Sequence, residues 1–271
     1  MPAACFENIK MEISINTVAF KTGSLTLAEK YIKKYGDRVG FEILPKFDED
    51  IYEQDINSAL DILRGREIAF HDVTFLAEHS AKRGTAEYEQ TMKMMRQIIP
   101  YCRELNCSHL TMHLNNCVIP EEEKEERLKN ALENISELKE IFSPIPFWIE
   151  NTGTEVGGNI LLDEEEFISL CKEKKFDVLF DIGHASANGW NLYRVIDELK
   201  GQIRGYHIHN NDGRHDLHSR FFDGVVDYDR LLPYMKEMTP EAEWIVEYCN
   251  TELEKYLIED IDRLLEYKKK A

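Results

Sequence analysis

Residues 145–184 read "IPFWIENTGTEVGGNILLDEEEFISLCKEKKFDVLFDIGH" and hold two strand-like runs on either side of an amphipathic segment. The runs at 145–150 and 177–182 are short and rich in β-branched and aromatic residues, which is typical of buried strands. Between them, Asp163 can cap the first amide groups of a helix over 163–173. This order of strand, helix and strand indicates a βα unit of a parallel sheet.

The same unit recurs along the whole chain. Six more strands are expected, at 11–18, 39–44, 66–71, 108–113, 203–209 and 243–248. Seven more helices are expected, at 24–35, 55–64, 85–105, 121–142, 190–200, 227–237 and 252–269. Eight such units predict an α/β protein folded as one closed (β/α)8 barrel, a TIM barrel, that spans residues 1–271 as a single domain.

The charge, hydropathy and cysteine content of the chain disfavour several classes of function. Lys and Arg total 33 against 51 Asp and Glu, a net charge of −18, which disfavours a nucleic-acid partner without excluding a local basic groove. No apolar run reaches the roughly 20 residues that span a bilayer, and no signal peptide begins the chain, so we expect a cytoplasmic protein without membrane contact. Six scattered cysteines without a C-x-x-C pair are expected to be reduced packing residues: Cys5, Cys102, Cys107, Cys117, Cys171 and Cys249.

Strands three to eight of the predicted barrel end in residue types that bind metals. These residues are His71, His113, Glu150, Asp181 with His184, His209 and Glu247. Because the chemistry of a (β/α)8 barrel lies at the carboxyl ends of its strands, we expect these side chains to converge there. Imidazole and carboxylate together suit zinc, manganese or another divalent ion. The sequence therefore predicts a divalent-metal centre above the barrel axis.

The stretch "RGYHIHNNDGRHDLH" (204–218) holds four of the nine histidines. Alternation along the strand points His207 and His209 to the same face, and a bend at Gly213 brings Asp216 and His218 over the mouth. We expect His209, Asp216 and His218 to be ligands and His207, deeper in the barrel, to be a packed group or the partner of a ligand. The remaining histidines are expected outside the site: His215 in solvent, His79 in a loop and His109 at the start of a strand.

These motifs resemble the xylose isomerase-like barrels, also grouped as AP endonuclease family 2. The matches are "IENTGT" at Glu150, "FDIGHASANGW" at Asp181, "HIHNNDGRHDLH" at His209 and "IVEY" at Glu247, and the resemblance covers almost the whole chain. It implies that these four residues bind one divalent ion. The endonuclease IV branch has five further ligands for a three-zinc cluster, which correspond to His71, His113, His184, Asp216 and His218.

The resemblance implies a sugar or sugar-phosphate isomerase or epimerase that works with one to three divalent ions, zinc or manganese. In that reaction Glu150 and Glu247 transfer a proton through an enediolate and His184 steadies a substrate oxygen. Substrate contacts are expected from Arg214, His71 and His113. The substrate would be a small carbohydrate, and homo-oligomerisation is left open.

Three alternatives accompany this hypothesis: a zinc-dependent endonuclease acting at abasic DNA sites, a dehydratase or lyase acting on a polyol, and an inactive barrel that senses a polyol. Two departures disfavour the endonuclease. The loop between His209 and Asp216 is shorter than in that branch and carries Arg214 as its only fixed positive charge. After His71, only Thr74 and Phe75 stand where that branch has an apolar wedge.

Overall fold

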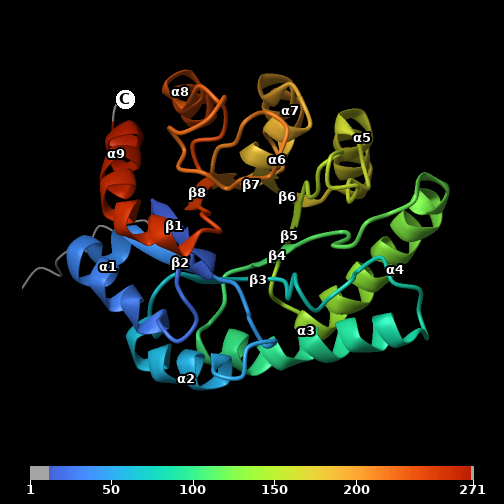
Figure 1. Ribbon diagram of the computed structural model, residues 1–271, viewed down its shortest axis with the longest axis horizontal. Helices are drawn as coiled ribbons and strands as arrows, with labels where there is room; N and C mark the ends of the chain where they lie inside the picture. The colour runs from blue at the N-terminus through green and yellow to red at the C-terminus, as the bar shows by residue number, and fades with distance from the viewer. Residues whose placement is uncertain (1–11, 270–271) are drawn as a thin grey trace, which may run out of the picture.

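The computed structural model describes residues 12–269, and in it eight parallel strands close into a barrel (Figure 1). Each strand pairs with the next along the chain, and β8 pairs with β1. The strands are β1 Ile13–Asn16, β2 Val39–Ile43, β3 Ile68–His71, β4 Leu110–Met112, β5 Phe147–Glu150, β6 Asp177–Asp181, β7 Ile203–Ile208 and β8 Glu243–Val246. All eight strands were predicted, and the predicted (β/α)8 barrel is confirmed.

Helices surround the barrel and cover the outward face of its strands (Figure 1). They are α1 Ala28–Tyr35, α2 Tyr52–Leu63, α3 Ala86–Glu104, α4 Lys124–Phe142, α5 Glu164–Lys174, α6 Ile182–Ala187, α7 Leu192–Leu199, α8 Tyr228–Met238 and α9 Leu257–Lys269. The last helix closes the ring against α1, where Tyr35 Oη donates to the carbonyl of Ile258 at 3.0 Å. All five positions of β2 are buried, because the parallel strands of a barrel are covered on both faces.

The eight predicted helices are present, and α5 begins at the capping residue that was expected. Asp163 accepts from the backbone amide of Glu166 at 2.9 Å, and the Glu166 carboxylate accepts from the Asp163 amide at 2.9 Å. This reciprocal capping box fixes the start of α5. The segment predicted as a helix over 252–269 begins as a 3-10 helix at Thr251–Tyr256 before α9.

One helix was not predicted. The sequence analysis ended a strand at Ile182, whereas α6 begins there, directly after β6. Asp181 accepts from the backbone amide of His184 at 2.6 Å and caps the helix. The six-residue helix turns the chain sharply at the barrel mouth, which brings His184 back over the strand end.

Five cysteines lie within residues 12–269, and all five are free thiols. Cys5 lies outside the described residues. The first position of the strand predicted at 11–18 also lies outside them. The predicted absence of disulfides holds for those five. Among the described helices, none combines the length and the apolar character that crossing a membrane requires.

Glu243, the first residue of β8, is a buried acid with a pH-dependent effect on stability. Burial, with a further contribution from Glu42, raises the pKa of Glu243 from 4.5 to about 7. Folding thus favours the neutral acid. The contribution of Glu243 to the unfolding free energy is complete below about pH 4.5 and is lost as the pH rises through about 7. Between about pH 5 and about pH 8, we expect wild type to lose about 2 kcal/mol of unfolding free energy relative to Glu243→Gln. Urea unfolding of both proteins at the two pH values measures this difference.

The matched control is Glu237→Gln, which changes an exposed carboxylate on α8. Its unfolding free energy should follow wild type at both pH values. Identical pH dependence in wild type and Glu243→Gln would show that the buried acid does not cause the loss.

Candidate metal centre

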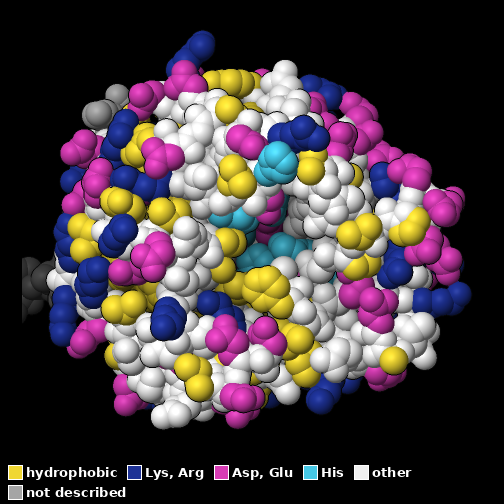
Figure 2. All heavy atoms as spheres, viewed as in Figure 1, with side chains coloured by type: hydrophobic (Ala, Val, Ile, Leu, Met, Phe, Trp, Pro, Cys, Tyr) yellow, Lys and Arg dark blue, Asp and Glu magenta, His cyan; other side chains and the backbone are white. Residues whose placement is uncertain are grey.

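The carboxyl ends of the strands surround a hollow with histidine and acidic side chains in its depth (Figure 2). It is a cavity of about 440 Å³, within the roughly 300–1,000 Å³ typical of small-molecule sites. Seven of the nine predicted ligands line it: His71, His113, Glu150, His184, Asp216, His218 and Glu247. Asp181 and His209 are fully buried behind this lining.

Five groups of His, Asp and Glu side chains bring their donor atoms within 4.8 Å of one another. The groups are His184, His209, Asp216 and His218; His71, His113 and Glu150; His71, His207 and Glu247; Glu150, Asp181 and His207; Asp181, His209 and Glu247. All nine residues predicted from the sequence belong to these groups. The structure adds one member, His207, which was expected to be a packed group or the partner of a ligand deeper in the barrel.

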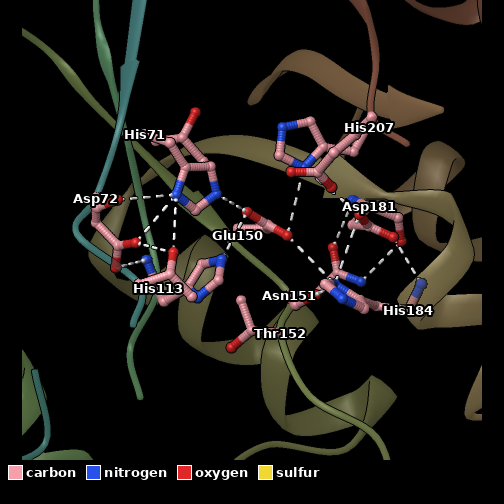
Figure 3. A network of polar contacts seen from close by, with 12 residues as sticks. His71, Asp72, His113, Glu150, Asn151, Thr152, Asp181, His184 and His207 are labelled. Atoms are coloured by element: carbon pink, nitrogen blue, oxygen red, sulfur yellow. Dashed lines mark hydrogen bonds and ion pairs between the residues drawn. The ribbon is translucent and has the colours of Figure 1, made fainter. Parts of the chain in front are cut away.

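On one side of the site, His71 and His113 both approach Glu150 (Figure 3). The distances from His71 Nε2 and His113 Nε2 to Glu150 Oε2 are 3.3 and 3.0 Å. His71 Nδ1 lies 3.0 Å from Asp72 Oδ1, and His113 Nδ1 lies 2.6 Å from Asn116 Oδ1. Because these contacts orient each ring, both Nε2 atoms face the same carboxylate, as ligands of a shared ion would.

On the other side, His184 and His218 approach Asp216. His184 Nε2 lies 3.2 Å from Asp216 Oδ2, and His218 Nε2 lies 3.0 Å from Asp216 Oδ1. The ring of His218 stacks on that of His209 with centroids 3.8 Å apart. His218 has a φ of 44°, in the left-handed region that a non-glycine residue seldom adopts. The backbone is thus strained at His218, the residue whose imidazole is turned into the site.

Beneath both sides, His207 lies among the carboxylates. Its Nδ1 is 3.3 Å from Glu247 Oε2, 3.4 Å from Glu150 Oε1 and 3.5 Å from Asp181 Oδ2. Its Nε2 lies 2.8 Å from Oε2 of Glu42, a fully buried residue of β2. These contacts fix the imidazole at the floor of the site.

Two positioning carboxylates were missed by the sequence analysis. Glu42 also accepts from Asn16 Nδ2 at 2.7 Å, and Asn16 Nδ2 reaches Glu247 Oε1 at 2.8 Å. Asp72 contacts His71 with one oxygen and His79 Nε2 with the other, at 2.9 Å. His79 was expected in a loop outside the site, but it is fully buried and supports a predicted ligand through Asp72.

Burial and pairing shift the pKa values of the site in opposite directions. Burial opposes the charge of Glu150, yet His113 and His207 lower the pKa of its carboxyl well below the usual range. Burial also opposes the charge of His71, but Asp72 and Glu150 raise the pKa of its imidazole well above the usual value. The buried carboxylates therefore require positive charge beside them, which either protons or a divalent ion can provide.

The residues fit a divalent ion. Three polar atoms of the donor groups are buried and make no hydrogen bond of good geometry among the described residues: Glu150 Oε1, His207 Nδ1 and His209 Nδ1. The first two lie 3.4 Å from each other without forming one. Such atoms are rare in folded proteins and call for a partner. Carboxylate and imidazole are donors that zinc and manganese both accept.

Gly183, the second residue of α6, allows His209 to pack against the backbone. A Cβ at this position would lie 2.0 Å from Cε1 of His209, so any larger residue must displace the ring. We expect Gly183→Ala to weaken zinc binding to the metal-free protein by at least about tenfold, as measured by isothermal titration calorimetry. Gly201→Ala is the control, because a Cβ there meets nothing within 4 Å. Unchanged affinity in Gly183→Ala would contradict the assignment of His209.

Two residues of the loop between β7 and α8 lie at the edge of the site. His215 is exposed, as expected, and its Nδ1 lies 2.7 Å from Asp212 Oδ2, although its side chain also lines the cavity. Arg214, predicted to contact substrate, is exposed and is not among the cavity-lining residues.

His109 is buried at the start of β4, as expected, and stacks on Trp148 with centroids 3.3 Å apart.

A closed barrel with polar side chains gathered at the carboxyl ends of its strands is typical of (β/α)8 enzymes. The family model of the xylose isomerase-like TIM barrel matches residues 31–267, and the chain belongs to this family. The resemblance inferred from the motifs is thereby confirmed.

Individual relatives are distant. The chain is 24% identical over 250 residues to an uncharacterised protein, MJ1311, of Methanocaldococcus jannaschii, covering 85% of this chain and 81% of that one. A D-tagatose 3-epimerase-like protein is 21% identical with a TM-score of 0.73, covering 94% of this chain and 99% of that one. The IOLI protein with a bound zinc atom is 19% identical with a TM-score of 0.71, covering 96% and 99%. At these identities the structural similarity shows the fold alone.

Proposed function

We propose that this chain is a divalent-metal-dependent isomerase or epimerase of sugars or sugar phosphates. The observation that carries the proposal is that Asp181, His209 and Glu247 form one buried donor group. Asp181 also belongs to a group with Glu150, so that side chains from four successive strand ends meet at the mouth of the barrel. The similarity to a D-tagatose 3-epimerase-like protein and to the zinc-containing IOLI protein supports the same choice.

Two carboxylates are placed to exchange protons with a substrate. Glu150 Oε1 and Glu247 Oε2 lie 3.4 and 3.3 Å from the same atom, His207 Nδ1, so both carboxylates reach the floor of the site. Both border the cavity. A substrate bound between them would present its two faces to two different bases, which is the geometry that inversion of a carbon centre needs.

The ion, when bound by Glu150, Asp181, His209 and Glu247, supplies polarisation of a substrate carbonyl. One carboxylate then removes the proton from the carbon beside that carbonyl, and an enediolate forms. The other carboxylate returns a proton to the opposite face for epimerisation, or to the neighbouring carbon for isomerisation. His184, which lines the cavity, would hold a substrate oxygen.

A second candidate is a zinc-dependent endonuclease acting at abasic sites. One specific observation favours it: the five further ligands of that branch, His71, His113, His184, Asp216 and His218, are all present in the donor groups. An AP endonuclease, family 2, from Brucella melitensis has a TM-score of 0.64 with this chain. The net charge of −18 and the lack of Lys or Arg among the cavity-lining residues oppose it.

The two candidates predict different products. Metal-loaded protein would be incubated in heavy water with a panel of ketoses and their phosphates, and separately with a duplex containing one abasic site. We expect solvent deuterium to enter a sugar through its enediolate, and we expect no incision of the duplex. Incision beside the abasic site, with binding that weakens steeply as salt rises and no deuterium in any sugar, would select the endonuclease.

A further inference from the structure

The exposed apolar side chains gather on the face that carries the site. Seven large hydrophobic residues are exposed among the described residues: Ile51, Phe75, Val118, Val156, Tyr193, Leu217 and Val225. All except Tyr193, which lies on α7, belong to loops that follow the carboxyl ends of strands. Exposed apolar residues are usually scattered singly over a protein surface. Their concentration on one face therefore indicates a binding surface.

Two of these residues line the cavity, and a third lies between two lining residues in the chain. Phe75 and Val156 line it, and their residues are 64% and 49% exposed. Leu217 is 51% exposed and lies in the chain between Asp216 and His218. Figure 2 shows hydrophobic side chains beside the hollow, with histidine and acidic side chains in its depth. The mouth is thus apolar at its edge and polar at its floor.

The cavity offers no permanently charged side-chain cation to a phosphate group. Its described lining contains no Lys or Arg, and it includes Glu150, Asp216 and Glu247. A phosphate away from the metal-ligand groups would therefore find no fixed positive charge beside it.

Backbone amides near the mouth are also engaged. In the loop between β5 and α5, the Thr154 amide donates to Asn159 Oδ1 at 2.9 Å and the Gly157 amide to Thr154 Oγ1 at 3.0 Å. The amide of Glu155 donates to Asn188 Oδ1 at 2.9 Å. These donors are not available as the anion nest that binds phosphate in other proteins.

We propose that the site takes an uncharged, non-phosphorylated sugar or polyol that carries an aryl or alkyl substituent. This inference rests on the proposed function and specifies its substrate class. The hydroxyl and carbonyl oxygens would lie at the donor groups on the floor, and the apolar substituent would lie against Phe75 and Val156. Covering those side chains removes apolar surface from water, which favours binding.

The test is a comparison of matched ligands by isothermal titration calorimetry with manganese-loaded protein. Methyl and phenyl β-D-glucopyranoside differ only in the apolar substituent, and neither has a free carbonyl, so binding is measured without turnover. We expect the phenyl glycoside to bind at least about tenfold more tightly, equivalent to about 1.4 kcal/mol. D-Glucose 6-phosphate should bind no more tightly than D-glucose. Equal or absent binding of the phenyl glycoside, or tighter binding of the phosphate, would overturn the inference.

Variants locate the effect. Phe75→Ala should remove most of the advantage of the phenyl glycoside and leave metal content and affinity for the methyl glycoside unchanged. Tyr193→Ala, which changes an exposed aromatic residue away from the cavity, should retain the advantage. Retention of the full advantage in Phe75→Ala would contradict the placement of the substituent.

Deuterium exchange separates this inference from the proposed function. Exchange into a free sugar without any advantage for the phenyl glycoside would reject the substrate class alone. An advantage for the phenyl glycoside, without exchange into any sugar, would reject the isomerase and retain the apolar subsite.

Discussion

Glu150→Gln and Glu247→Gln are each expected to lower turnover by at least about a thousandfold while the barrel stays folded. The physical reason is that each substitution removes both a negative ligand charge and a proton acceptor, and general acid–base catalysis alone contributes about 10²–10⁴-fold. Turnover is measured as deuterium incorporation into the sugar that wild type accepts. Circular dichroism and the urea midpoint report whether the fold is retained.

The control for this pair is Glu155→Gln. Glu155 is an exposed carboxylate in the loop after β5, on the same face of the barrel, and its replacement should leave turnover near wild type. Full activity in both Glu150→Gln and Glu247→Gln would eliminate these residues as proton-transfer groups. Loss in only one of them would favour a reaction with a single base.

His218→Ala is expected to lower the number of bound divalent ions. Four predicted ligands beyond the core set, His71, His113, Asp216 and His218, belong to donor groups, so elemental analysis of wild type should find more than one ion per chain. The variant should lose about one ion, because His218 contacts Asp216 and stacks on His209.

His215→Ala is the matched control, since His215 lies in the same loop but is exposed and bonded to Asp212. It should keep the wild-type metal content. A single ion in wild type that persists in His218→Ala would assign the loop to substrate recognition. The core of Glu150, Asp181, His209 and Glu247 would stand unaffected by that result.

The barrel was predictable because its pattern is local. Each strand is a short apolar run and each helix a longer amphipathic one, so the units are visible one at a time, and eight in succession leave a closed barrel as the natural arrangement. Seven of the nine predicted ligands were visible for the same reason, because they end strands or follow them within a few residues. Asp216 and His218 lie further along the loop after β7, where the cluster of histidines was the signal. The structure brings all nine together, and their role as ligands stays a prediction.

What the sequence did not predict depends on contacts between distant segments. Asn16 and Glu247 are 231 positions apart, and only closure of the barrel places their side chains 2.8 Å from each other. The one signal for a role of Glu42 in the site was its position as a charged residue inside the buried run "VGFEI". The one signal for Asp72 was its position directly after the predicted ligand His71. The helix α6 was missed because six residues are too few to show a helical period.

The most direct test of the account is reversible removal of the metal. A chelator would strip the protein, and deuterium exchange from heavy water into the accepted sugar would be measured before stripping, after stripping and after addition of manganese or zinc. Metal-dependent proton transfer predicts exchange in the loaded protein, its loss from the stripped protein and its return with the ion. Undiminished exchange in protein shown by elemental analysis to be metal-free would contradict the account.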